Sequence, residues 1–144
     1  MSVSVFTVFA TAFFAATVIP VASEVVLAAA LTDESLARWT LWIAATAGNT
    51  LGAVLNWGLG RFGTLYREQS WFPTSPSQME RAEEWFWRYG VWTLLLVWLP
   101  VVGDALTVIA GLLRVRLSVF LILVGIGKGA RYAAVIAGVD ALLF

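Results

Sequence analysis

Four apolar stretches follow one another along the 144-residue chain. They cover residues 3–31, 39–60, 91–113 and 117–143, and the connections are short except for the more polar segment 61–90. A helix needs about 20 residues to cross the hydrocarbon of a bilayer, so each stretch is long enough to span it. The pattern predicts an all-helical integral membrane protein whose whole chain forms a single membrane domain.

The first and third stretches are interrupted in the same way, by a proline followed four residues later by an acid. One reads Pro20-Val-Ala-Ser-Glu24 and the other reads Pro100-Val-Val-Gly-Asp104. Proline disrupts a helix, a carboxylate in hydrocarbon costs at least about 2.5–3.5 kcal/mol, and irregular backbone at membrane depth needs cover from protein or water. We therefore expect a re-entrant helical hairpin in each stretch, with Pro20, Pro100 and Gly103 at the tips.

Each expected hairpin is followed by one crossing helix, over residues 39–60 and 117–143. The fold class predicted in this way is an all-α membrane protein of two inverted-repeat units. Many transporters are built from such repeats and have their substrate site at the repeat interface.

Arginine counts separate this arrangement from the alternative of four plain spanning helices, two of them kinked by proline. With four spans, four arginines lie on one side of the membrane and three on the other. With two hairpins, Arg38 lies alone on one side, and six arginines share the other: Arg61, Arg67, Arg81, Arg88, Arg114 and Arg116. Because Lys and Arg collect on the cytoplasmic side, the hairpins are favoured. Residues 61–90 are then cytoplasmic, and both termini lie outside.

The polar segment 61–90 contains the start signal of a helix. Ser75 suits the N-cap, Pro76 suits the first helical position, and Gln78 completes a capping box, so a helix is expected to run to about Tyr89. Its apolar residues fall at helical spacing; they are Met79, Ala82, Phe86 and Tyr89. Such a helix lies in the bilayer interface with its aromatic face toward lipid, or it packs against the helix bundle.

Five polar residues within the apolar stretches form the candidate site. Asn49 lies near the middle of the second stretch, Lys128 lies near the middle of the fourth, and Arg131 follows on the same helix face. Together with Glu24 and Asp104 the two cations sum to zero charge, which is the least costly way to keep four such groups in a membrane. We hypothesise that Asp104 faces one of the two cations, with Glu24 close by, and that the cluster lines a polar cavity. Ion pairs that only lock the halves together are the alternative.

Composition agrees with a membrane location. Apolar residues make up 60% of the chain, charged residues make up 12%, and the mean hydropathy is +0.86. Average soluble domains carry about 25% charged residues, so the chain has too little charge to be a soluble enzyme. Nine cations balance nine acids, which leaves no basic surface for nucleic acid. The chain has no Cys and no His, which excludes thiol catalysis, His-based triads and thiolate metal sites. Because no nucleophile or metal set accompanies the acids, we expect no enzyme activity, no cofactor and no metal.

Several of these segments resemble the DedA family of membrane proteins, and most closely its short YqaA-like branch. The residues that carry the resemblance cover most of the chain: Pro20-Val-Ala-Ser-Glu24-Val-Val-Leu, Gly48-Asn49-x-x-Gly52, Asn56-x-x-x-Gly60-Arg61, Trp98-Leu-Pro-Val-Val-Gly-Asp104, Ala110-Gly-Leu-Leu-Arg-Val-Arg116 and Gly127-Lys128-x-x-Arg131-Tyr132.

The resemblance implies two re-entrant hairpins, each followed by a crossing helix, in a multi-pass protein of the bacterial inner (plasma) membrane. Family members are associated with moving lipids between leaflets, namely undecaprenyl phosphate in bacteria and phospholipids in eukaryotic relatives, and some are linked to the proton-motive force. Glu24 takes the acidic position near the first tip. Typical members carry arginines where this chain has Val97 and Gly103. Arginine binds phosphate well, so Lys128 and Arg131 are the cations left for an anionic lipid.

These observations give a first hypothesis and two alternatives. The first is a DedA-like transporter that moves undecaprenyl phosphate or a phospholipid between leaflets, with proton coupling as a further option. The alternatives are a small ion- or proton-coupled transporter, and a membrane assembly protein that transports nothing. The expected partners are membrane lipids and protons, together with further copies of the chain in a homo-oligomer.

Overall fold

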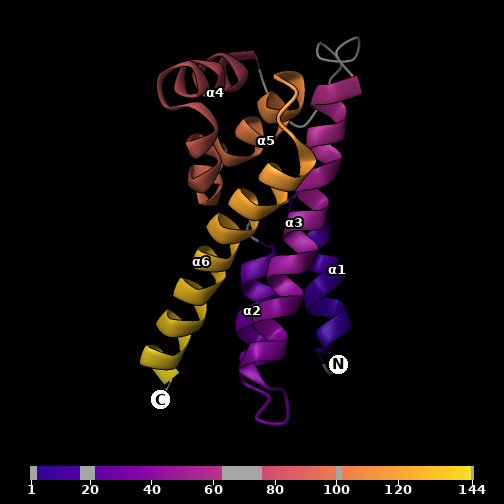
Figure 1. Cartoon of the computed structure of the whole chain (residues 1–144). Helices are drawn as coiled ribbons and strands as arrows, with labels where there is room; N and C mark the ends of the chain where they lie inside the picture. Colours follow the sequence, from indigo (N-terminus) through magenta and orange to yellow (C-terminus); the bar gives the residue numbers. More distant parts are fainter. Residues whose placement is uncertain (1–2, 17–21, 63–75, 100–101, 144) are drawn as a thin grey trace.

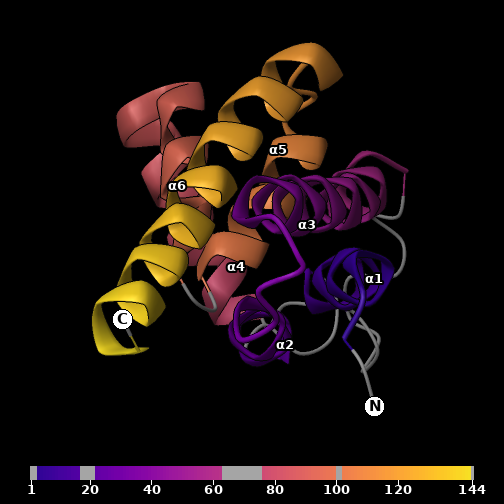
Figure 2. The same cartoon turned by 90° about the horizontal axis from the view of Figure 1, so that it is seen from below.

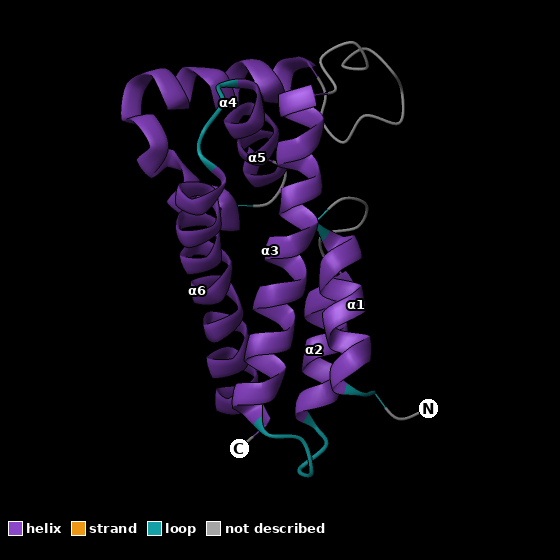
Figure 3. Cartoon of the chain, turned by 45° about the vertical axis from the view of Figure 1, so that its right-hand side comes forward, coloured by secondary structure: helices purple, strands orange, loops and turns teal. Residues whose placement is uncertain are grey.

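The computed structural model describes residues 3–16, 22–62, 76–99 and 102–143. The all-helical prediction is confirmed for these residues (Figures 1 and 3). The helices are α1 Val5–Ala15, α2 Ala22–Leu31, α3 Arg38–Phe62, α4 Pro76–Tyr89, the 3-10 helix η2 Gly90–Trp98, α5 Val102–Leu112 and α6 Leu117–Leu143.

Helix α3 is the central element, and it contacts α1, α2, α5 and α6. Glycines let its backbone approach its neighbours closely, as small residues do at membrane helix interfaces. A Cβ atom at Gly48 would overlap the carbonyl oxygen of Phe9, and one at Gly52 would overlap that of Phe13. The Gly48-x-x-x-Gly52 motif therefore packs α3 directly against α1 (Figure 2).

The other half of α3 meets α5 through a second pair of glycines. A Cβ at Gly60 would overlap the carbonyl oxygen of Val108, and a Cβ at Gly111 would overlap that of Trp57. Each helix thus places a glycine against the backbone of the other at the point where they cross. This contact joins the second half of the chain to the first.

The first apolar stretch consists of two short helices in contact, α1 and α2. The side chain of Ser4 accepts a hydrogen bond from the backbone N–H of Thr7 and so caps the start of α1. The start of α1 and the end of α2 lie at the same end of the molecule (Figures 1 and 3). Residues 17–21, with the expected tip Pro20, lie outside the described residues.

The third apolar stretch also consists of two short helices in contact, η2 and α5. Both lie at the opposite end of the molecule from the start of α1 (Figure 1). The expected tip Pro100 lies outside the described residues. Gly103 lies in the first turn of α5, where a Cβ would overlap the carbonyl oxygen of Val97. The small residue at this position lets the start of α5 pack on the end of η2.

The two leading arms differ in winding. Helix α1 has 11 residues and η2 has nine. A 3-10 helix rises about 2.0 Å per residue and an α-helix about 1.5 Å. Although η2 has fewer residues, it is therefore about 18 Å long, close to the roughly 16 Å of α1.

Helix α4 covers Pro76–Tyr89, the range expected from its sequence signals. The expected aromatic face does not point only to lipid, however, since Ala82 and Phe86 are buried in the core beside α5. Packing of α4 on α5 buries these two residues, while Tyr89 stays exposed. Of the two arrangements that the sequence left open for this helix, packing against the bundle accounts for the burial of Ala82 and Phe86.

Two turns join the long helices to their neighbours. After α5, Arg114 adopts the left-handed conformation with φ of 60°. The N–H of Val115 donates to the carbonyl of Ala110, and that of Arg114 donates to Gly111, which is the bonding of a Schellman motif. Between α2 and α3, the Asp33 carboxylate accepts hydrogen bonds from the hydroxyl and the N–H of Ser35. These bonds hold the pKa of Asp33 below its usual value.

Among the described helices, α6 alone is both long and apolar enough to be recognised as a membrane span by length and composition. It has 27 residues and mean hydropathy of 1.7. Helix α3, predicted to cross as well, is long enough with 25 residues but is less apolar. Helices α1, α2 and α5 are apolar but have only 10 or 11 residues, about half of the roughly 20 that crossing requires.

The close packing of α3 on α1 can be tested with two alanines on the same helix. We expect Gly52→Ala to lower the free energy of unfolding by about 1–3 kcal/mol, because the new methyl group has no room beside Phe13 and Ala16. Gly58→Ala is the matched control, since no described atom of another element lies within 4 Å of a Cβ there. It should raise stability by up to about 1 kcal/mol. Thermal melting in detergent measures both, and equal shifts would refute the packing.

Candidate functional site

The centre of the candidate site is an ion pair between α2 and α6. Glu24 lies in the first turn of α2, and its carboxylate accepts a hydrogen bond of 2.6 Å from Nε of Arg131. The Nη2 atom of Arg131 contacts the same oxygen. The side chains of Glu24 and Arg131 are 31% and 15% exposed, so the pair is largely shielded but still partly accessible. A partly open ion pair can exchange its partners for those of a ligand.

Asp104 and Lys128 lie next to this pair without forming a direct one. Asp104 is half-buried in the first turn of α5, and its charge interacts with those of Lys128 and Arg131. Lys128 is only 2% exposed. No hydrogen bond or ion pair joins the side chains of Asp104 and Lys128 in the described part of the chain. The two acids, one from each half of the chain, thus act on the cations of a single helix.

A buried chain of hydrogen bonds adjoins the ion pair. Tyr132 is fully buried, and its hydroxyl donates to the hydroxyl of Ser23 at 2.9 Å. The amide Nδ2 of Asn49 donates to the Tyr132 oxygen at 3.0 Å. Since Ser23 precedes Glu24 and Tyr132 follows Arg131, these bonds hold α2, α3 and α6 together beside the charged pair.

One face of α3 carries buried oxygens without hydrogen-bond partners. Four buried side-chain oxygens have no hydrogen-bond partner in the described structure, and all four lie on that face: Thr46 Oγ1, Asn49 Oδ1, Thr50 Oγ1 and Asn56 Oδ1. A buried oxygen without a partner costs about 1–3 kcal/mol, whereas water can satisfy it. This face of α3 is therefore suited to water or to a polar ligand.

The structure brings three of the five predicted site residues into one hydrogen-bonded neighbourhood, namely Glu24, Asn49 and Arg131. The other two, Asp104 and Lys128, are within electrostatic reach of it. The sequence did not point to Ser23 as a member. The sequence around Ser23 does not single it out, because small residues such as serine are also common where membrane helices pack together.

A second ion pair joins the far ends of the long helices and was not expected from the sequence. Arg38, at the start of α3, donates from Nε and Nη2 to the Asp140 carboxylate near the end of α6, over 2.8–3.1 Å. Each side chain is more than a third exposed. Arg38 and Asp140 are 102 positions apart in the sequence, so no local spacing pattern could have predicted their contact.

Among the described residues, no group of three or more Asp and Glu side chains comes together. The chemistry that the site offers is charge pairing and hydrogen bonding in an otherwise apolar surround.

The VTT domain model matches residues 3–140. The chain belongs to this family, the DedA family of membrane proteins. The inner membrane protein YqaA of Escherichia coli is 42% identical over 136 residues, which cover 94% of this chain and 91% of that protein. The membrane location and the family inferred from the sequence are thereby confirmed.

More distant relatives extend the comparison. An uncharacterised protein of Haemophilus influenzae is 36% identical over 89% of this chain and 82% of its own length. Undecaprenyl phosphate transporter A of Staphylococcus aureus is 27% identical over 74% of this chain and 58% of its own length. The named relatives are a membrane protein and a transporter rather than enzymes. No solved structure matches the chain.

The Glu24–Arg131 pair can be tested by a double-mutant cycle. We expect Glu24→Gln and Arg131→Met each to lower the free energy of unfolding by about 1–3 kcal/mol, because each leaves a shielded charge without its partner. The double variant should lose less than the sum of the two. Arg81→Met, at an exposed position of α4, is the control and should change little. Additive losses of the two single variants in detergent melting would contradict the pairing.

Proposed function

We propose that the chain is a multi-pass transporter of the bacterial inner membrane that moves a lipid from one leaflet to the other. One observation carries the proposal: the Glu24–Arg131 pair, with Asp104 and Lys128 beside it, lies where helices from both halves of an apolar chain meet. Charged groups in a membrane protein are costly and mark substrate or ion paths by default. The membership of the family and the named relatives agree with transport.

The proposed membrane arrangement has two re-entrant hairpins, α1–α2 and η2–α5, each followed by one crossing helix. It is supported by the short lengths of their helices. It is also supported by the position of the start of α1 and the end of α2 at one end of the molecule (Figure 3). Helices α3 and α6 then cross, and the two units are inverted relative to each other. The acid of each hairpin, Glu24 or Asp104, begins its returning helix near the middle of the membrane.

The proposed orientation puts α4 and the turn after α5 on the cytoplasmic side. The six arginines counted in the sequence then lie there, with Arg38 outside. Trp87 and Tyr89 of α4 are 78% and 54% exposed, and such side chains suit the headgroup region. In this arrangement α4 lies along the inner interface while it packs on α5.

The proposed cargo is a lipid with an anionic headgroup, either undecaprenyl phosphate or a phospholipid. The Staphylococcus aureus relative is named for the first of these. A headgroup phosphate suits Arg131, because guanidinium binds phosphate in a two-pronged geometry. It would have to take the place of Glu24, which already occupies that guanidinium. Protonation of Glu24 would release Arg131 for the lipid, and this exchange gives a route for proton coupling.

Reconstitution in liposomes tests the proposal. We expect the wild-type chain to exchange labelled undecaprenyl phosphate or phospholipid between leaflets, faster with a pH gradient than without one. Glu24→Gln should abolish the pH dependence, because Gln cannot take up a proton. It should also lower exchange at least about tenfold, because no carboxylate remains to displace the lipid phosphate from Arg131 and release it. Glu84→Gln, at an exposed position of α4, is the matched control and should exchange lipid normally.

Two results would overturn the proposed function. Proton flux without lipid movement would make the chain an ion- or proton-coupled transporter. No flux of either kind, with Glu24→Gln lowering only the melting temperature, would make the charged cluster a structural lock in an assembly protein.

The hairpin arrangement can be tested separately, because the chain has no cysteine of its own. Single cysteines at Ser4, Ser35 and Ser118, which are all exposed, are to be labelled in intact cells with a membrane-impermeant thiol reagent. We expect Ser4→Cys and Ser35→Cys to react from outside, and Ser118→Cys to react only after the cells are opened. Labelling of Ser4→Cys and Ser35→Cys from opposite sides would refute the hairpin and support a plain crossing helix.

A further inference from the structure

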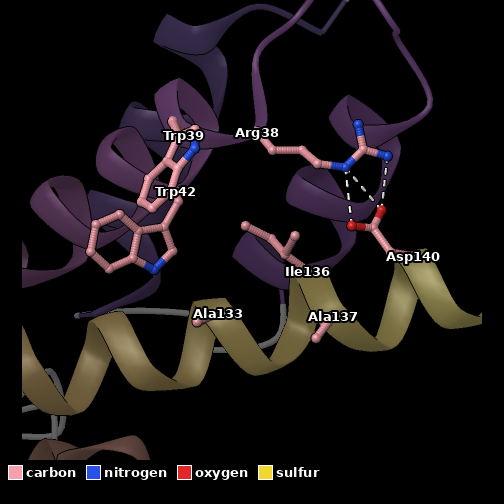
Figure 4. A pocket seen from close by; sticks show the side chains of 7 residues that line it. All are labelled: Arg38, Trp39, Trp42, Ala133, Ile136, Ala137 and Asp140. Carbon is pink, nitrogen blue, oxygen red and sulfur yellow. Dashed lines mark hydrogen bonds and ion pairs between the residues drawn. The ribbon is translucent and has the colours of Figure 1, made fainter.

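Helices α3 and α6 diverge toward the end of the molecule that holds the start of α3 and the end of α6 (Figure 1). A pocket of about 440 Å³ lies between them. This volume is in the range of pockets that hold small molecules, about 300–1,000 Å³. Its lining residues are Arg38, Trp39, Trp42, Ala133, Ile136, Ala137 and Asp140 (Figure 4).

One end of the pocket is apolar and firmly built. The indole N–H of Trp42 donates to the carbonyl of Gly129 at 2.9 Å, which fixes the ring between the two helices. Trp39 stands edge-on to Trp42, with ring centres 6.1 Å apart. On α6 the small residues Ala133 and Ala137 are one turn apart and leave room for a ligand (Figure 4).

The other end of the pocket carries one charge of each sign. Figure 4 shows the Arg38–Asp140 pair at this end, with the two tryptophans at the opposite end. The guanidinium and the carboxylate are 39% and 35% exposed, so both can be reached from outside. From Ala133 to Asp140 the helix rises about 10 Å, which is the distance between the apolar end and the charged end.

We infer that this pocket binds a phospholipid whose headgroup contains both a phosphate and an ammonium group. The Arg38 guanidinium would bind the phosphate, and the Asp140 carboxylate would accept hydrogen bonds from the ammonium group. The first part of an acyl chain would lie along Ala133 and Ala137 toward Trp42. Arg38 and Asp140 would thereby give up each other as partners. Arg38 would pair with the phosphate and Asp140 with the ammonium group, so that no charge is left unpaired.

Charge selects this lipid over an anionic one. A headgroup with phosphate alone would compete with Asp140 for Arg38 and would leave that carboxylate without a partner. An ammonium group beside the phosphate removes this cost, because it restores opposite charge to both side chains. Position agrees as well, since the pair lies at the ends of two long helices, where the headgroups of a bilayer lie.

The pocket shares no residue with the Glu24–Arg131 site, so the inference does not depend on lipid transport. A lipid bound here would join the diverging ends of α3 and α6 from the outer leaflet in the proposed orientation. It would act as a bound structural lipid rather than as cargo.

Native mass spectrometry of the full chain in detergent tests the inference. The probes are phosphatidylethanolamine and phosphatidylglycerol with the same acyl chains. We expect the wild type to bind the zwitterionic lipid at least about tenfold more tightly than the anionic one. Asp140→Asn should reduce this preference to about threefold or less, because the ammonium group loses its carboxylate acceptor.

A pair of phenylalanines supplies the steric test. Ala137→Phe fills the pocket and should weaken binding of phosphatidylethanolamine at least about tenfold. Ala134→Phe is its matched control, since this exposed residue of α6 does not line the pocket, and it should bind as the wild type does. Thermal melting in detergent without added lipid shows which variants are folded. If only one of Ala137→Phe and Asp140→Asn folds, its lipid binding alone is enough to test the inference.

Three results would overturn the inference. The first is equal binding of the two lipids by the wild type. The second is equal loss of binding in the two phenylalanine variants. The third is a lipid-free dimer that Ala137→Phe dissociates, because the occupant of the pocket would then be a second copy of the chain.

Discussion

Carbonyl groups at the end of a helix need hydrogen-bond donors, and inside an apolar protein water is scarce. Helix α1 ends in the interior, and α3 supplies one donor to a carbonyl at that end and another to the turn that follows α5. The amide of Asn56 donates to the carbonyl of Ala16 at the end of α1, at 2.9 Å. The indole of Trp57 donates to the carbonyl of Val115 in the turn after α5, at 3.0 Å. Neighbouring residues of one helix thus stabilise both interrupted halves of the chain.

The polar site follows from the same constraint. Because α1 ends early and α2 begins again beside α6, the first turn of α2 brings Ser23 and Glu24 to the middle of the last helix. If α1 and α2 formed one uninterrupted helix, Glu24 would lie beyond the middle of α6 and could not meet Arg131 there. The glycines of α3 permit this because they let α1 and α5 approach until backbone meets backbone. The break in the helix, the close approach and the paired charges are therefore parts of one arrangement.

Much of the architecture was predictable from local signals. The two Pro-x-x-small-acid strings indicated where the apolar stretches break, and the capping signals at Pro76 indicated the range of α4. What could not be predicted depends on pairings across the chain. Arg38 meets Asp140, and Tyr132 meets Ser23, over more than 100 residues, with no periodicity to signal either contact. The sequence left open whether the apolar face of α4 meets lipid or protein, because an aromatic stripe fits both equally well.

The winding of η2 has a consequence for movement. A 3-10 helix has poorer hydrogen-bond geometry than an α-helix, and runs as long as nine residues are uncommon. Rewinding the same nine residues as an α-helix would shorten this arm by about 4–5 Å. In the proposed membrane arrangement, the start of α5, and Asp104 with it, would then be drawn toward the cytoplasmic side by nearly one helical turn. The depth of the second acid in that arrangement thus depends on the helical pitch of η2.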